Sequence, residues 1–99
     1  MIAPLLLILE DEPQLRDVLL RSLRAEGFDA RGFATAHELL DRVESLAADA
    51  LVIDIGLPDA DGRDVCQALR ARGVAAPVLF LTARDALTDR LSGFTVGVR

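Results

Sequence analysis

The stretch LVIDIGLPDADG at residues 51–62 decides the fold of this chain. Residues 51–53 are bulky and mostly β-branched, which is typical of a buried strand in a parallel sheet. Gly56 and Pro58 end that strand before the next helical pattern begins. Asp54 is therefore expected at the carboxyl end of a buried strand, at the edge of an open α/β sheet where ligands bind.

Strand-like and helix-like segments alternate along the whole sequence. The predicted strands are residues 5–9, 28–33, 51–54 and 78–81, and the predicted helices begin near residues 13, 35, 62 and 85. Thr35-Ala36-His37-Glu38 predicts a capping box at the start of the second helix. This β-α-β-α-β-α-β-α order predicts right-handed crossovers and a parallel sheet with helices on both faces, which is a three-layer α/β sandwich.

Length, composition and charge describe one globular domain. The chain has 99 residues, of which 52% are hydrophobic and 27% charged, and this balance excludes a disordered protein. A net charge of -5 argues against binding of nucleic acid or an anionic membrane by this chain. The longest apolar run, residues 5–9, is too short to span a bilayer. A single cysteine cannot form an internal disulfide, so we expect a reducing compartment, the cytoplasm.

Polar residues follow three predicted strands at the point where each one ends. Glu10 and Asp11 follow the first, Asp54 ends the third and Thr82 follows the fourth. One such acid alone would favour a helix cap or a solvated turn, but the first and third strands flank one crevice of a doubly wound sheet. Close carboxylates repel one another, and Mg²⁺ relieves this repulsion. The carbonyl of Gly56 is expected to help hold it.

Other catalytic and metal-binding patterns fit the sequence poorly. An EF-hand built on Asp59-Ala60-Asp61-Gly62 would begin at Leu57 and close at Ala68, and neither residue is a ligand. The only histidine, His37, lies at a predicted helix start away from the acids and is expected on the surface. Cys66 has no partner for nucleophilic catalysis, so we expect a small, buried or half-buried residue.

Three motifs together resemble the receiver domain of bacterial two-component response regulators. The motifs are residues 10–13, residues 54–62 and residues 80–85. The match is closest to the subfamily in which a winged-helix DNA-binding domain follows the receiver, and it runs through Gly97. The resemblance implies a flavodoxin-like, doubly wound parallel sheet of order 2-1-3-4, with residues 1–99 forming a receiver domain that is incomplete at its C-terminus.

The resemblance also implies a role for each residue at the sheet edge. Asp54 is the phosphoacceptor, which takes a phosphoryl group from a sensor histidine kinase. Asp11, Asp54 and the carbonyl of Gly56 bind Mg²⁺, and Glu10 holds a metal-bound water. Thr82 senses the phosphoryl group and switches a neighbouring surface. Such a domain controls a transcriptional output and is not an enzyme.

The sequence departs from the family pattern at its C-terminal end. The fifth strand and last helix of the family are missing, and so is the lysine that pairs with the phosphoryl group, because the chain contains no lysine. Residues 78–81 should then form an unpaired apolar edge, and the face beneath the first helix should lose part of its cover. Such an edge favours self-association with a second chain. Alternatively, the chain is a fragment of a longer regulator.

Three functional hypotheses follow. The first is a Mg²⁺-dependent phosphorelay receiver, favoured by the acids and Thr82. The second is a phosphorylation-silent dimerisation or binding module, favoured by the missing lysine. The third is a small Mg²⁺-dependent hydrolase, for which no base or phosphate cradle is evident.

Overall fold

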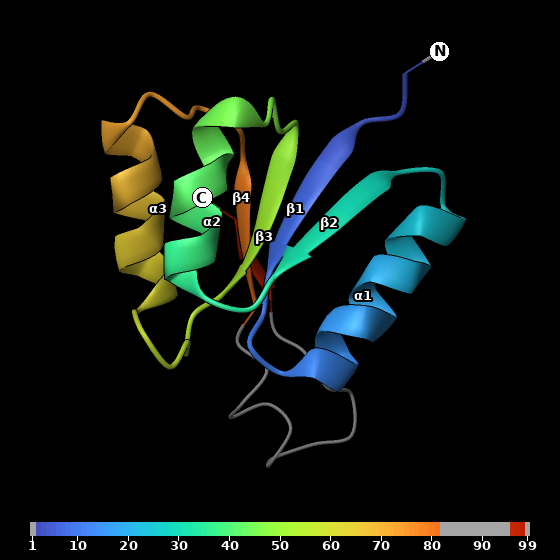
Figure 1. The fold of residues 1–99 in the computed structure, drawn as a ribbon, viewed down its shortest axis with the longest axis horizontal. Coiled ribbons are helices and arrows are strands. Elements are labelled where there is room, and N and C mark those ends of the chain that lie inside the picture. Colours follow the sequence, from blue (N-terminus) through green and yellow to red (C-terminus); the bar gives the residue numbers. More distant parts are fainter. Residues whose placement is uncertain (1, 82–95, 99) are drawn as a thin grey trace.

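The computed structural model describes residues 2–81 and the backbone of residues 96–98. Strands and helices alternate as far as β4, in the order predicted from the sequence (Figure 1). The elements are β1 (Leu5–Leu9), α1 (Pro13–Ala25), β2 (Asp29–Phe33), α2 (Ala36–Arg42), the 3₁₀ turn η1 (Val43–Ser45), β3 (Ala50–Asp54), α3 (Gly62–Ala71), β4 (Val78–Leu81) and β5 (Val96–Val98). Thr82 and the short helix predicted from Asp85 lie outside the described residues.

One sheet forms the middle layer, with strand order β2-β1-β3-β4-β5. The first four strands are parallel, which confirms the predicted doubly wound order. Helices α2 and α3 cover one face of the sheet and α1 covers the other (Figure 1). None of the helices in the described part of the chain has the length and apolar character that crossing a lipid bilayer requires.

The prediction that β4 forms an unpaired edge is wrong. Strand β5 pairs with it in antiparallel fashion, with Leu79 opposite Val98 and Leu81 opposite Val96. An exposed row of backbone N–H and C=O groups favours pairing, and here a later segment of the same chain supplies the partner. Pairing of β4 itself with a second chain therefore has no free edge to use, and self-association stays a prediction.

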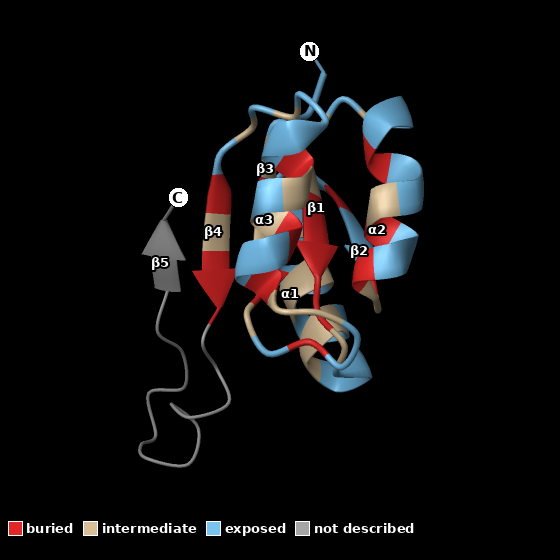
Figure 2. Ribbon diagram, turned by 90° about the vertical axis from the view of Figure 1, so that its left-hand side faces the viewer, coloured by how far each residue is buried: buried red, intermediate tan, exposed pale blue. Residues whose placement is uncertain are grey.

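The main core lies between the sheet and helices α2 and α3. Alternate side chains of the central strands, such as Leu7 and Leu51, are fully buried in the core that contains residues of both helices. Figure 2 shows most of strand β4 in the colour of buried residues. On the opposite face Ile8 is fully buried, whereas Leu6 and Val52 are only half-buried, and α1 has no fully buried side chain. This agrees with the expectation that β1 and β3 lose part of their cover beneath the first helix.

Local signals in the sequence set the helix ends. Thr35 and Glu38 form the predicted capping box, in which the Glu38 N–H donates to Thr35 Oγ1 at 3.2 Å. Gly27 adopts φ 97° just after α1, a conformation that glycine reaches without strain. Helix α2 ends at Arg42, where the chain tightens into the 3₁₀ turn η1.

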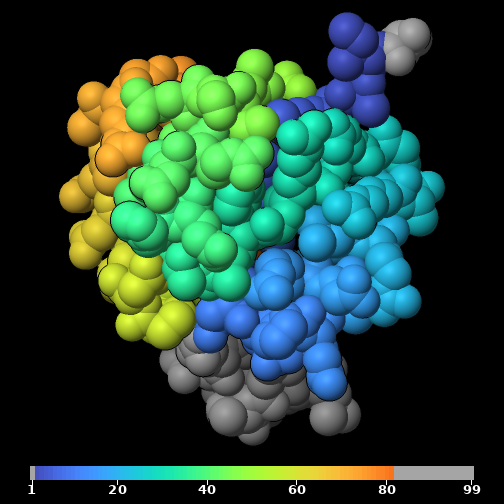
Figure 3. Space-filling model, viewed as in Figure 1, coloured from blue at the N-terminus to red at the C-terminus, as the bar shows by residue number. Residues whose placement is uncertain are grey.

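The N-terminal residues project beyond the amino end of β1 (Figure 3). Ile2 is 95% exposed, so it contributes nothing to the core. The chain is held from Pro4 onward, because the Asp29 N–H donates to the Pro4 carbonyl at 2.9 Å. The ordered sheet therefore begins where the apolar run of β1 begins.

Candidate metal centre

Three acids converge at the carboxyl ends of β1 and β3. The last registered pair of these strands is Leu9 with Ile53, so the next residues, Glu10 and Asp54, lie side by side. Each of Glu10, Asp11 and Asp54 offers one oxygen, and these oxygens all lie within 4.8 Å of one another. The cluster predicted from the strand ends is therefore present.

Glu10 is a buried carboxyl with incomplete hydrogen bonding. Its side chain is 2% exposed, and Oε2 accepts the N–H of Glu12 at 3.0 Å. Within the described part of the chain Oε1 has no hydrogen-bond partner. Burial raises the pKa of Glu10 to about 7, the Glu12 N–H opposes that rise, and the neighbouring Asp54 and Asp11 carboxyls add to it.

These features fit a hard divalent cation. A buried oxygen without a donor is unfavourable unless a proton or a cation satisfies it. The donor set contains only carboxylate oxygens, which Mg²⁺ prefers over nitrogen or sulfur ligands. A cation at this position would satisfy Glu10 Oε1 and relieve the repulsion among the three acids.

Arg16 holds the backbone that carries the first two acids. Its Nη1 donates to the Glu10 carbonyl at 2.8 Å and lies 3.5 Å from the Asp11 carbonyl. Sequence analysis did not identify this residue. The sequence feature that could have identified Arg16 is a basic residue in the first turns of a helix that begins directly after an acidic strand end.

The loop after β3 folds back tightly on Asp54. Asp54 Oδ1 accepts the Gly56 N–H at 3.2 Å, and Gly56 pairs with Asp61 in an isolated β-bridge. The Gly62 N–H donates to the Ile55 carbonyl at 2.8 Å. A Cβ at position 62 would collide with the Asp54 carbonyl oxygen, so glycine is needed there for close approach. That the Gly56 carbonyl binds metal stays a prediction.

Two other acids of this loop are helix caps. Asp59 Oδ1 and Oδ2 accept the N–H groups of Ala36 and His37 at 3.1 and 3.3 Å, which ties the loop to the start of α2. Asp61 caps α3 by accepting the Arg63 N–H at 2.8 Å. Hydrogen bonds from Arg63 lower the pKa of Asp61 to about 2. Neither acid belongs to the metal cluster.

His37 and Cys66, two further residues considered in the sequence, are not part of the acid cluster. His37 is 81% exposed in its side chain and contacts Asp41 at 3.3 Å, which confirms the predicted surface position. Cys66 is half-buried, as expected. Thr82 falls outside the described residues, so its predicted role is unchanged.

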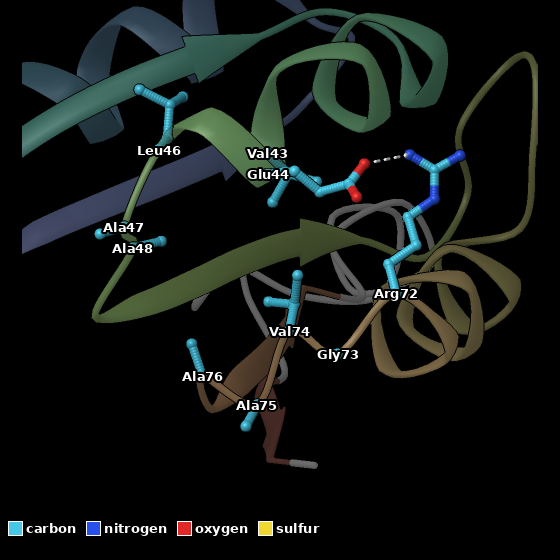
Figure 4. Close-up of a pocket in the computed structure, with 10 residues that line it drawn as sticks. All are labelled: Val43, Glu44, Leu46, Ala47, Ala48, Arg72, Gly73, Val74, Ala75 and Ala76. Atoms are coloured by element: carbon cyan, nitrogen blue, oxygen red, sulfur yellow. Dashed lines mark hydrogen bonds and ion pairs between the residues drawn. The ribbon is translucent and has the colours of Figure 1, made fainter.

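A separate hollow of about 420 Å³ opens at the opposite end of the sheet (Figure 4). It lies between η1 with the segment that follows it and the α3–β4 connection. Its one cationic side chain, Arg72, donates to the Leu40 carbonyl at 2.8 Å and contacts Glu44 at 3.4 Å. The hollow therefore has no part in the acid cluster.

Comparisons with known proteins point to one family. A response regulator receiver domain model matches residues 6–99. TrcR of Mycobacterium tuberculosis is 38% identical over 91 residues, covering 92% of this chain and 35% of that protein. CreB of Escherichia coli is 40% identical over 90 residues, covering 91% of this chain and 39% of that protein. The chain thus spans well under half the length of these transcriptional regulatory proteins.

Solved structures show the same fold. The receiver domain of Francisella response regulator 1452 matches with a TM-score of 0.77 at 24% identity, covering 91% of this chain and 74% of that one. Thermotoga maritima TrrA, solved with Mg²⁺-BeF, matches with a TM-score of 0.71 at 27% identity, covering 76% and 65%. A complex of histidine kinase ThkA with TrrA matches with a TM-score of 0.75 at 29% identity, covering 81% and 69%.

Proposed function

The chain belongs to the family of response regulator receiver domains, and on that premise we propose that Asp54 accepts a phosphoryl group from a sensor histidine kinase. The observation that carries this proposal is the convergence of Glu10, Asp11 and Asp54 within 4.8 Å. The proposed role is that of a stoichiometric phosphoacceptor in a cytoplasmic phosphorelay, not of a turnover enzyme. In this role the chain is the receiver part of a transcriptional regulator.

The proposed chemistry is a transfer between two side chains. A carboxylate oxygen of Asp54 attacks the phosphorus of the kinase phosphohistidine, an O–P bond forms, the N–P bond breaks, and the histidine nitrogen leaves with the electron pair. Bound Mg²⁺ supplies positive charge against the phosphoryl oxygens. The β3–α3 loop holds Asp54 in place through the Gly56 N–H.

The two acids that follow β1 are proposed to help bind the metal. Asp11 and Asp54 would bind Mg²⁺ directly, with the Gly56 carbonyl, and Glu10 would hold a metal-bound water. The unpaired Oε1 of Glu10 supports that assignment, because a water or cation would satisfy it. The Mg²⁺-BeF complex of TrrA and the ThkA complex support the metal and the kinase partner. Thr82 is the proposed phosphoryl-sensing hydroxyl.

One observation favours a second function. All 11 Lys or Arg residues of the given sequence are arginine, whereas the family pairs the phosphoryl group with a lysine. Arginine is bulkier and presents a planar fork, so it does not simply replace an ammonium group. The second candidate is therefore a phosphorylation-silent module that keeps the fold and the cation but signals only by binding.

Phosphorylation of the purified chain tests both candidates. The chain is incubated with a small acyl phosphate and Mg²⁺, and the intact mass is measured for the native chain, Asp54→Ala and the control Asp17→Ala, whose carboxylate is 63% exposed on α1. A phosphoryl adduct on the native chain and the control, but not on Asp54→Ala, supports the receiver. No adduct while Mg²⁺ still binds supports the silent module, and rapid multiple-turnover phosphate release supports a hydrolase.

A further inference from the structure

Arg16 connects helix α1 to the backbone beneath the acid cluster. Its Nη1 donates to the Glu10 carbonyl at 2.8 Å and reaches the Asp11 carbonyl at 3.5 Å. Its own N–H donates to the Glu12 carbonyl at 2.9 Å. One residue thus contacts three consecutive carbonyls of the segment that carries Glu10 and Asp11.

Packing of the Arg16 stem against β2 directs its guanidinium toward the Glu10 carbonyl. The stem of Arg16 lies over β2, where a Cβ at Gly32 would come within 3.0 Å of Arg16 Cδ and 3.2 Å of Cγ. Leu20 Cδ1 lies over the same glycine. The absence of a side chain at position 32 therefore leaves room for the stem between α1 and β2. The end of β2 holds the same segment, because the Glu10 N–H donates to the Phe33 carbonyl at 3.0 Å.

Most other arginines of the described residues bind partners outside the acid cluster. They are Arg21, Arg24, Arg31, Arg63, Arg70 and Arg72. On the same helix, Arg21 forms an exposed pair with Asp17 at 3.1 Å. It therefore provides a matched control with the same side chain, the same helix and no contact with the acids.

We propose that Arg16 is a positioning residue for the metal centre, holding the Glu10 and Asp11 carbonyls so that their carboxylates converge with Asp54. The inference rests on the proposed Mg²⁺ site. Carboxylates that repel one another spread apart unless the backbone that carries them is held. A charge-assisted hydrogen bond to a carbonyl is one of the stronger restraints a side chain provides.

The charge of Arg16 and its hydrogen bonds affect Mg²⁺ binding in opposite directions. A cation near the acids competes with Mg²⁺, so removing its charge alone would tighten binding. Removing the hydrogen bonds that hold the ligand backbone would weaken binding. The direction of the change therefore separates positioning from simple electrostatics.

The test is Mg²⁺ titration of the whole 99-residue chain by isothermal calorimetry, since the chain has no Trp or Tyr for fluorescence. Arg16→Met keeps an apolar stem over Gly32 but removes the donors and the charge. It is expected to bind Mg²⁺ about 10-fold more weakly, as is usual when a residue supporting metal ligands is lost. Arg16→Lys keeps the positive charge but lacks the planar guanidinium fork. Its Mg²⁺ affinity is expected to be about 3-fold lower than that of the native chain. Arg21→Met is expected to match the native chain.

Each outcome decides the proposal. Equal or tighter Mg²⁺ binding by folded Arg16→Met overturns it, and so does a loss of urea stability with unchanged affinity, because that result describes a structural residue only. If Arg16→Met does not fold, Arg16→Lys decides, and native affinity in that variant also overturns the proposal. If the native chain itself binds no Mg²⁺, the proposed metal site fails as well, whereas native binding with an unaffected Arg16→Met variant overturns only the role of Arg16.

Discussion

Glu10→Gln should make the metal-free chain more stable at neutral and alkaline pH. Glu10 is 2% exposed, and its Oε1 has no hydrogen-bond partner in the part of the chain that the structure describes. An ionised carboxylate in this position is unfavourable, whereas a neutral amide of nearly the same shape is not ionised at any working pH. The substitution therefore removes the electrostatic cost and keeps most of the packing.

The pKa of Glu10 determines the size and sign of this effect. Burial, with the nearby Asp54 and Asp11 carboxyls, raises the pKa from 4.5 to about 7. Below pH 4.5 the carboxyl is protonated in both folded and unfolded chains. As the pH rises from 4.5 to 7, the unfolded chain releases its proton while the folded chain keeps it, so folding stability falls. The full loss, reached above pH 7, is about 3 kcal/mol at most.

Urea denaturation in buffer with a chelator measures this loss. The free energy of unfolding is determined between pH 5 and pH 8 for the native chain and Glu10→Gln. The gap between them is expected to widen by about 2 to 3 kcal/mol as the pH rises. Glu44→Gln, which changes a carboxylate that is 64% exposed, is the matched control and should follow the native chain.

Added Mg²⁺ should reverse the effect. At a concentration 100 times its dissociation constant, a bound ion stabilises the folded chain by about 2.7 kcal/mol, and the native chain should gain more than Glu10→Gln. Parallel pH profiles of the native chain and the glutamine variant in metal-free buffer would refute the reasoning. They would mean that the Glu10 carboxylate is solvated in the folded chain.

Substitutions at three further positions test the structure around the site. Gly62→Ala should destabilise the chain by about 2 kcal/mol in urea, because the new Cβ collides with the Asp54 carbonyl; native stability would show that the loop does not pack this closely. Thr35→Ala should lower the free energy of unfolding by about 1 kcal/mol, because the Glu38 N–H loses its cap. Unchanged amide exchange in α2 would contradict that cap. Asp59→Ala should lower folding stability by about 1 kcal/mol, and Asp59→Asn by about half of that, as measured by thermal unfolding. Equal losses in the two variants would argue that Asp59 does not accept two hydrogen bonds.

The fold could be predicted because its signals are local. The apolar runs that became β1 and β3, the capping box at Thr35 and the glycine stop at Gly27 each depend on a few neighbouring residues. The alternation of strands and helices then leaves few topologies to choose from. Parallel strands place their carboxyl ends at one edge, so the sequence predicts that the acids at 10, 11 and 54 lie together, as they do in the structure.

The features that the sequence did not predict are contacts between segments far apart in the chain. The pairing of β4 with β5 depends on where the chain returns, and no local pattern encodes that path. The Asp59 bonds to α2 cross 23 and 22 residues, and sequence alone assigns such an acid equally well to a turn, a cap or a ligand.

The sequence by itself determined which residues form strands and helices and which acids end the strands, because propensity, capping and periodicity act over a few residues. Only the tertiary structure decided that Glu10 is buried with an unsatisfied oxygen and that Arg16 holds its carbonyl. Burial and hydrogen-bond geometry depend on how α1 packs across β2, where Gly32 leaves the necessary space. That packing is a property of the assembled layers, and burial within them raises the pKa of Glu10.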